Sequence, residues 1–520
     1  MTPQGDRSSR QALTAGVRRL WAQLAPIRSR IHARATVETR SLAAFRIALA
    51  TVILVDLLHR SRHLALFYTD QGGYPVAAYE VTYTEYTGVS IHALSGALWF
   101  QQFMFFVAGL FAVAMLVGYR TRLVTFVSFL LLLSLHARNP GVLNGGDKLL
   151  RLLLFLAVLP PTGERWSIDA LRRGTARDHV ASFGTAVVLI QPVVVFTQNA
   201  IRKHRGEQWY AGEALEIALS SDAMRIGLGN VIVEYPALLT VLDYGWITLL
   251  AGSSVFLLLT VGRLRTLAAL TYIAAFVGML TAMAVGLFPL VLIASVLPFL
   301  TAPFWDRLAA RVPARWVDRL PDSDQLGPLG NPPFERRLLD RLRERGHTSF
   351  VTFPRSLLTV FGALVFVWIL LFSASAVSGY EVPDRIDYDH LDQQDWGLYA
   401  PDPPTTYSWY VVEAEQEDGR RVDAIDGGAV DFDRPPDGSA AYKTFRHRKF
   451  MRLVRSSGQG HTSSIVADSY GEWACRQAND RYDGATERVT VYQLLQSIPL
   501  DGRYEEPDRR LVLQQGCEST

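Results

Sequence analysis

Long apolar runs alternate with short polar and basic segments over most of the chain. A helix that crosses a membrane needs about 20 largely apolar residues, and several of the runs approach this length. The last two runs before residue 304 are separated only by the region of Gly286 and Pro289, so a tight re-entrant hairpin is an alternative to two spans there. The pattern predicts eight or nine transmembrane helices, at residues 41–58, 97–118, 122–137, 148–161, 182–200, 237–261, 266–285, 287–303 and 356–377.

The polar segments divide the chain further. Residues 1–40 are rich in arginine and favour a cytoplasmic amphipathic helix on anionic lipid, with an organellar transit peptide as the alternative. Residues 304–355 form a polar linker, and residues 378–520 contain strand-like alternation and Asp-Gly turns. We therefore expect an α-helical polytopic membrane protein, with a transmembrane domain at 41–303, a last helix at 356–377 and a small C-terminal β-rich extramembrane domain.

The arginines and lysines predict the orientation. Those of the N-terminal segment, the short loops and the 304–355 linker fall on one side of the predicted spans, and cytoplasmic loops carry such an excess. The protein is thus expected in the cell membrane as a multi-pass protein, with a cytoplasmic N-terminus and an extracytoplasmic C-terminal domain. The only cysteines, Cys475 and Cys517, could form one disulfide if that domain is extracytoplasmic.

Composition agrees with this class. Hydrophobic residues make up 49% of the chain and the mean hydropathy is positive. The formal net charge is only +3, and the basic residues gather beside apolar runs, which argues against nucleic acid as a partner and in favour of membrane lipids.

The segment "TQNAIRKHRGEQWYAGEALEIAL" begins at Thr197, at the end of the fifth predicted span. One interpretation makes Lys203 an interfacial anchor, with aromatic residues of the segment in the headgroup region. The other makes Lys203 a general base, whose pKa is lowered by partial burial and by the neighbouring cations. The second interpretation assigns supporting or binding roles to the other residues of the segment: Arg202, His204, Trp209 and Gly212.

The segment "HARNPGVLNGGDKLLRLLLF" begins at His136. Asn144 followed by Asp147 is typical of a helix cap, and Gly145 with Gly146 allows close approach to the backbone. The unpaired N–H groups of that helix end could hold an anionic or carbonyl oxygen. Asp147 and Arg151 share one helix face, so they form either an intrahelical ion pair or a ligand-orienting pair.

Two further groups of polar residues, both beginning in the first span, have alternative interpretations. Arg46 and Asp56 of the first span do not share a face, and Arg46 could reach the cytoplasmic headgroups. The spacing of Asp56, His59 and His63 could supply metal ligands, although no matched set completes a site, and we predict no metal.

In the tail, "DQQDWGLYAPDPP" is expected to rest on the membrane domain through Trp396 and Tyr399. A basic run from Lys443 to Arg452 favours a solvated strand face over a surface for anionic lipid or an acidic polypeptide.

Four segments together resemble the HTTM (horizontally transferred transmembrane) domain family, whose eukaryotic relatives are the vitamin K-dependent gamma-carboxylases. They are "SLAAFRIALA", "RNPGVLNGGDKLLRLLLFLAVLPP", the pattern Lys203-x5-Trp209-x2-Gly212-x-Ala214, and "QDWGLYAPDPP". Their order and spacing extend the resemblance over about residues 36–303 and the start of the tail. The chain departs from the eukaryotic enzymes in a lysine one residue further from the Trp, in Gly-Gly-Asp where they carry Asn-His, and in a shorter tail.

The resemblance implies a function. In the carboxylases a lysine before a Trp-x2-Gly element deprotonates reduced vitamin K, and oxygenation then gives a base strong enough for glutamate carboxylation with CO2. It implies Lys203 as that base, Asn144 and Asp147 as its catalytic neighbours, and reduced vitamin K or a menaquinone-like quinol, O2 and CO2 as the small molecules. A glutamate-containing polypeptide is the implied substrate.

Two hypotheses from other classes remain beside this one. A non-catalytic lipid-binding or scaffold protein would use the Lys203 loop for phospholipid headgroups and the tail for a partner. A transporter is the third class, which solute flux would reveal.

Overall fold

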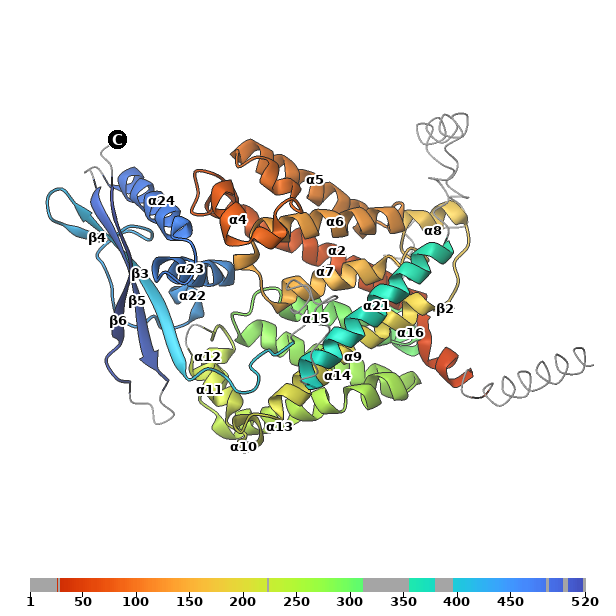
Figure 1. Ribbon diagram of the computed structural model, residues 1–520. Helices are drawn as coiled ribbons and strands as arrows, with labels where there is room; N and C mark the ends of the chain where they lie inside the picture. Colours follow the sequence, from red (N-terminus) through yellow and green to blue (C-terminus); the bar gives the residue numbers. More distant parts are fainter. Residues whose placement is uncertain are drawn as a thin grey trace, which may run out of the picture.

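The computed structural model describes residues 26, 29–221, 224–311, 355–378, 396–482, 486–498 and 504–517 (Figure 1). The first 25 residues and most of the predicted 304–355 linker lie outside this part of the chain, as does the beginning of the predicted "DQQDWGLYAPDPP" contact.

Five helices in the described ranges are long and apolar enough to cross a membrane, and a sixth span results if one bent helix pair is counted. The chain is therefore an integral membrane protein, but the predicted eight or nine spans are not confirmed. The bent pair turns by 103° between Phe288–Phe299 and Ala302–Ala309. The five helices are α2 (Thr39–Ser61), α5 (Leu98–Leu116), α6 (Thr121–Arg138), α9 (Phe183–Lys203) and α14 (Gly262–Ala282).

Three of the other predicted spans are shorter helices, and a fourth is a longer helix with a short apolar stretch. At about 1.5 Å per residue, a helix of 13 residues such as α7 extends about 20 Å, less than the roughly 30 Å of a hydrocarbon core. These helices are α7 (Gly145–Ala157), α13 (Pro236–Ala251), α15 (Phe288–Val296) and α21 (Arg355–Ser378), of which the last is apolar over Thr359–Ser375.

Burial separates central from peripheral helices. In α2 and α9, 61% and 67% of the apolar window is buried within the protein, compared with 33% in α5 and 28% in α14. An apolar helix with so little buried surface is suited to face lipid. The strands β1 (Thr36–Glu38) and β2 (His179–Ala181) pair antiparallel just before α2 and α9, which holds the beginnings of the two central helices side by side.

Short helices fill the connections. On the side where α2 ends they are α3 (Leu64–Tyr68), α4 (Val76–Thr82), η1 (Thr84–Tyr86), η2 (Ile91–Leu94) and η3 (Pro140–Val142). After α9 they are α10 (Gln208–Ala211), α11 (Ala214–Ser220) and α12 (Gly229–Ile232). The remaining ones are α8 (Ile168–Arg173), the π-helix η4 (Ser254–Leu259), η5 (Leu297–Phe299) and α16 (Ala302–Ala309).

The tail combines a sheet with helices (Figure 1). Its antiparallel strands follow the order β4-β3-β5-β6, and α23 and α24 pack between this sheet and the membrane helices. The predicted β-rich domain is thus found, with two substantial helices added to it. The elements are β3 (Thr406–Gln416), β4 (Arg421–Asp423), α22 (Gly438–Ala441), α23 (Phe445–Gly458), α24 (Ile465–Arg481), β5 (Thr486–Ser497) and β6 (Asp508–Gly516).

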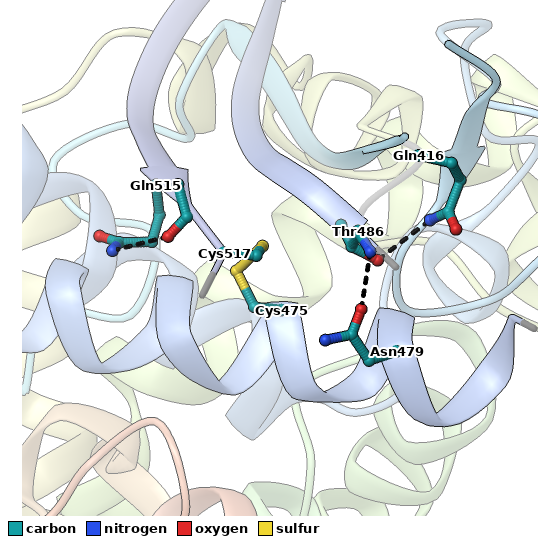
Figure 2. The surroundings of a disulfide bond; sticks show 7 residues. Gln416, Cys475, Asn479, Thr486, Gln515 and Cys517 are labelled. Atoms are coloured by element: carbon teal, nitrogen blue, oxygen red, sulfur yellow. Dashed lines mark hydrogen bonds between the residues drawn. A yellow bond between two sulfur atoms is a disulfide. The ribbon is translucent and has the colours of Figure 1, made fainter. Parts of the chain in front are cut away.

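A disulfide fastens the tail helix α24 to the end of the sheet. Cys475 of α24 is bonded to Cys517, which follows β6 (Figure 2). One turn further along α24, Asn479 accepts a hydrogen bond from the backbone N–H of Thr486 at 2.9 Å, and Gln416 donates to the Thr486 hydroxyl at 3.0 Å. Covalent and polar contacts therefore fix this helix to β5 and to the end of β6, and Gln416 links β5 to β3.

The basic run from Lys443 to Arg452 is mostly helical, so the predicted strand face is wrong. Thr444 caps α23 by accepting a hydrogen bond from the His447 N–H, and the helix then buries Phe450, Met451 and Val454. Their spacing is that of one helix face. A short run of charged and apolar residues fits both the helical period of 3.6 and the strand period of 2. In this segment the capping hydrogen bond of Thr444 favours the helix.

Candidate functional site

The Lys203 side chain is buried at the end of the central helix α9. Only 1% of its surface is exposed. Its Nζ atom donates a hydrogen bond of 2.9 Å to the backbone carbonyl of Tyr399 and lies 3.1 Å from the centroid of the Trp209 ring. Trp209 Nε1 donates to the same Tyr399 carbonyl at 2.9 Å. Lys203 and Trp209, predicted together from their spacing, are thus joined by a tail residue, and Lys203 is not an exposed interfacial anchor.

The first described residues of the tail close over this amine. Asn199, one turn before Lys203, donates to the Trp396 carbonyl at 2.8 Å. On the other side, the Asp402 carboxylate accepts the N–H groups of Glu207 and Gln208 at 3.1 and 3.0 Å. The expectation that Trp396 and Tyr399 rest on the membrane domain is confirmed.

A glycine makes this closure sterically feasible. A Cβ atom at Gly206 would lie 2.4 Å from Asp402 Oδ1 and 2.5 Å from the Pro401 carbonyl oxygen. Real Cβ atoms do not approach a backbone oxygen so closely, so any larger residue would displace the tail segment. Gly212 has a different role: its φ of +78° ends α10, and a Cβ there would meet Thr240 of α13.

Two carboxylates, Asp243 and Asp402, are close enough to act on the Lys203 amine through space. Neither forms an ion pair with it. Asp243 lies fully buried on α13, where both its oxygens accept the Leu215 N–H at 3.1 Å, while Asp402 is bound to α10 as described. In the part of the chain that the structure describes, Lys203 therefore forms no ion pair.

The neighbouring cations do not surround the amine. His204 and Arg205 are exposed, and the His204 ring binds the Tyr210 hydroxyl at 2.8 Å, while Arg202 is half-buried. The predicted crowding by these cations therefore does not shield the amine from solvent. The predicted burial is found, and it comes from Trp209 and the tail segment.

Sequence analysis missed Tyr399, Asp402 and Asp243 as parts of this site. Tyr399 contributes a backbone carbonyl, which any residue type could supply. A carboxylate within an apolar run such as that of α13 is expensive unless it is bound, and this was a usable signal for Asp243. Asp402 gave only the signal of a turn-forming residue between prolines.

A second cluster of buried charges lies where the tail helix α23 meets the membrane helices. Arg60 of α2 contacts Asp56 and Asp147, both at 2.8 Å. Arg446 of α23 donates to Asp147 at 2.7 and 3.1 Å and also to Asp56. Arg446 further binds the Val142 carbonyl at 3.1 Å. Two guanidinium groups thus neutralise two carboxylates at the contact between the two domains.

The same cluster includes three groups that could hold a metal ion, namely Asp56, His136 and Asp147. Both carboxylates already bind arginines, so their charge is balanced by protein groups. The alternative metal set with His59 is not assembled, because His59 is exposed whereas Asp56 is buried.

Asn144 and Asp147 form the predicted cap of α7. Asn144 Oδ1 accepts the N–H groups of Gly146 and Asp147 at 2.8 and 3.2 Å, and Asp147 accepts the Asn144 N–H at 2.8 Å. These two helix N–H groups therefore bind Asn144 rather than an anionic ligand. A Cβ at Gly146 would lie 2.8 Å from the backbone of Phe288, so it is α15 that approaches this turn, while Gly145 is less restricted.

Asp147 does not pair with Arg151. Within the described ranges its carboxylate contacts Arg60, Arg446 and, at 3.6 Å, His136. The predicted intrahelical pair was reasonable from spacing, but two buried arginines from distant parts of the chain bind the carboxylate instead. No described contact joins this cluster to Lys203.

Arg46 is also buried, so the prediction that it reaches the headgroups is wrong. Its guanidinium donates to the carbonyls of Thr162 at 2.8 Å, Arg165 at 3.3 Å and Leu116 at 3.4 Å, and to Trp166. These carbonyls lie at the end of α5 and in the loop before α8. Arg46 therefore fixes the loop before α8 against the end of α5.

The helix α23 places further cations between the two regions. Burial, followed by the charges of Arg452, Arg448 and Lys148, lowers the pKa of Lys449 to about 8. Arg448 donates to the Ala284 carbonyl at 3.4 Å. The basic run is therefore partly an internal surface that faces the membrane helices.

Comparison with known proteins supports the family resemblance. The HTTM domain model matches residues 35–305, more than half of the chain. The match contains Lys203, Trp209, Asn144 and Asp147, whereas Tyr399, Asp402 and Arg446 lie beyond it. No curated protein and no solved structure gives a significant match to the chain. The chain belongs to the HTTM domain family.

Proposed function

We propose that the protein is a membrane enzyme similar to the vitamin K-dependent gamma-carboxylases, in which Lys203 acts as a proton acceptor in quinol-linked, oxygen-dependent chemistry. One observation carries the proposal. The amine is buried at the end of a span, where it meets a carbonyl and an aromatic ring and forms no ion pair with a described residue. A contacting carboxylate would hold the ammonium form, whereas a base must be free to lose its proton.

The donor set around Lys203 suits a hydroxyl-bearing lipidic ligand. A neutral amine that donates to the Tyr399 carbonyl still has its lone pair and a second N–H. Nearby, α13 exposes Leu238, Val241 and Leu242, an apolar face that would let a lipidic molecule approach from the bilayer. When bound, a vitamin K or menaquinone-like quinol would supply an acidic hydroxyl, and Lys203 would accept its proton.

The other chain residues have supporting roles in this proposal. Trp209 and the Tyr399 carbonyl orient the amine and exclude water from it. Asn144 and Asp147 position the tail through the Arg446 contacts rather than touching the quinol. O2 and CO2 as co-substrates, and a glutamate-containing polypeptide as the acceptor, belong to the proposal through the family resemblance alone.

The test measures quinol oxidation by the purified protein with a short-chain menaquinol. Replacing a general base removes about 10²–10⁴ in rate, so Lys203→Ala and Lys203→Arg should both lose at least about 100-fold, because a guanidinium stays protonated. Arg205→Gln, an exposed change in the same loop, serves as the control and should retain the wild-type rate. Full activity of Lys203→Arg, or no quinol oxidation by the wild type, would overturn the proposal.

We place the tail outside the cytoplasm, in agreement with the basic-residue asymmetry. The Cys475–Cys517 bond supports this side, because disulfides persist in oxidising compartments. An alkaline phosphatase fused after Thr520 should then be active, and a fusion at Arg311 inactive, since this reporter folds only where disulfides form. The reverse pattern would contradict the orientation without affecting the role of Lys203.

A further inference from the structure

A pocket of about 510 Å³ lies between the membrane domain and the tail, apart from the Lys203 site. The membrane domain contributes the end of α2, the helix α3 and the beginning of α5. The tail contributes α23, α24 and the segment after β4. Its polar lining consists of Ser61, Arg62, His63, Gln102, Lys443, His447, Gln477 and Arg481, and the rest of the lining includes Leu64, Leu98, Phe105 and Trp473.

The pocket lining carries cations without a lining carboxylate. Arg62, Lys443 and Arg481 are basic, and His63 and His447 add two imidazoles. Asp426, just outside, pairs with Lys443 at 2.8 Å, and Arg481 donates to the Ile425 carbonyl at 2.9 Å. With three basic side chains and only this one carboxylate nearby, the pocket carries a net positive charge.

The pKa values of both imidazoles in the pocket are lowered. Burial, then His63 and Lys443, lowers the pKa of His447 to about 4, against a smaller opposite effect of Asp426. Burial, then Lys443 and Arg62, lowers the pKa of His63. The buried His447 Nδ1 atom has no hydrogen-bond partner among the described residues. A buried polar atom left unpaired in a positive pocket points to an anionic partner from outside the chain.

The pocket also lies where spans end. α2 ends at Ser61 and α5 begins at Leu98, so the lining is at one surface of the membrane domain. Leu98, which lines the pocket, and its sequence neighbour Trp99 are 46% and 68% exposed, so apolar side chains are exposed at this end of α5. Cations beside apolar residues at this depth suit a lipid phosphate.

We propose that this pocket binds a phosphate-bearing group at the membrane surface, with Arg62 and Lys443 as its principal charged contacts. The group comes either from an anionic phospholipid headgroup or from free phosphate. Charge-assisted hydrogen bonds from guanidinium and ammonium groups are the usual contacts of such oxygens.

Binding should strengthen as the pH falls. A bound anion favours the protonated imidazoles of His447 and His63, against the opposing charges of Arg62, Lys443 and Arg481 that face them, while Asp426 acts in the same direction as the anion. Binding thus takes up protons. Because phosphatidylglycerol keeps its charge between pH 5 and 8, its affinity should rise as the pH is lowered toward 5.

The experiment compares two probes on the full chain. Native mass spectrometry in detergent would count bound phosphatidylglycerol, and calorimetry would measure inorganic phosphate. Arg62→Gln and Lys443→Gln change exposed or half-exposed side chains, so they should fold, and each should weaken the probe that binds by about 10-fold. Arg510→Gln on β6, also an exposed arginine, should leave it unchanged.

The outcomes separate clearly. Binding of the lipid alone identifies a headgroup site, and binding of both probes identifies a general phosphate site. Equal affinity in Arg62→Gln and Arg510→Gln, or no binding of either probe, would overturn the inference. Since Lys203 lies outside the pocket, Lys203→Ala should bind the probe like wild type, so failure of the Lys203 hypothesis would not affect this result.

Discussion

Two buried charge sites join the tail to the membrane domain, and they are built differently. At the α23 contact, Arg60 and Arg446 meet Asp56 and Asp147 directly, so every charge has a partner of opposite sign. At the end of α9, Lys203 has a carbonyl and an aromatic ring instead. Complete pairing is suited to holding two domains together, whereas an unpaired buried amine is suited to chemistry.

The largest expected effect is that of removing one arginine from the paired site at the α23 contact. Arg446→Ala would leave Asp56 and Asp147 with Arg60 alone, and removing one partner of a buried ion pair typically costs about 3–5 kcal/mol. We expect a strongly lowered thermal midpoint in detergent and easier proteolysis of the tail. Arg452→Ala, an exposed change on the same helix, is the control. Equal midpoints for the two variants would mean that the α23 contact does not depend on this pairing.

The next effect concerns the tail itself, which both sites require. Cys475→Ser together with Cys517→Ser removes a crosslink between residues 42 apart, and such bonds typically stabilise by about 2–4 kcal/mol. The thermal midpoint should fall, and reductant should lower the wild type to the same value while leaving the variant unchanged. A wild type insensitive to reductant would show that α24 and β6 hold together without the bond.

The two sites also differ in how far the sequence could predict them. Periodicity and length located α2, α5, α6 and α9 to within a few residues, and the Asn144 cap was predicted from two residue types. Besides Arg60 one turn away, however, Asp56 binds Arg446, which lies 390 residues further along the chain on a helix that the sequence pattern did not predict. No local period reveals such a contact, because it depends on how the tail docks.

The surroundings of Lys203 were predicted only in part. The spacing to Trp209 gave one neighbour, and the resemblance gave a role. Partial burial of the amine was expected together with flanking cations, but the groups that bury it are the Tyr399 carbonyl and the tail segment that Asp402 holds against α10. Any residue type can supply a backbone carbonyl, so the contact of Lys203 with Tyr399 could not be predicted from the sequence.

A smaller effect tests this closure. Gly206→Ala places a Cβ against Asp402 and Pro401, and overpacking of this kind costs about 1–3 kcal/mol. The tail segment should shift, and Lys203 should become reactive toward an acylating reagent, read by mass spectrometry. Gly245→Ala on α13, where a Cβ would meet nothing within 4 Å, should leave Lys203 as protected as in wild type. Equal protection in both variants would show that the segment does not shield the amine.

The smallest expected effect concerns Lys449, a partly buried cation on α23 near the paired site. Its pKa of about 8 in the folded protein lies below the ordinary 10.5, so the folded state holds this proton less well than the unfolded state. The resulting destabilisation is complete below pH 8 and disappears as the pH rises to about 10.5. Lys449→Gln should therefore raise the thermal midpoint at pH 7 and have no effect near pH 10.5. Arg510→Gln should change little at either pH. A stabilisation by Lys449→Gln that persisted unchanged at pH 10.5 would trace to packing rather than charge, and the cations of α23 would then be well accommodated where they face the membrane helices.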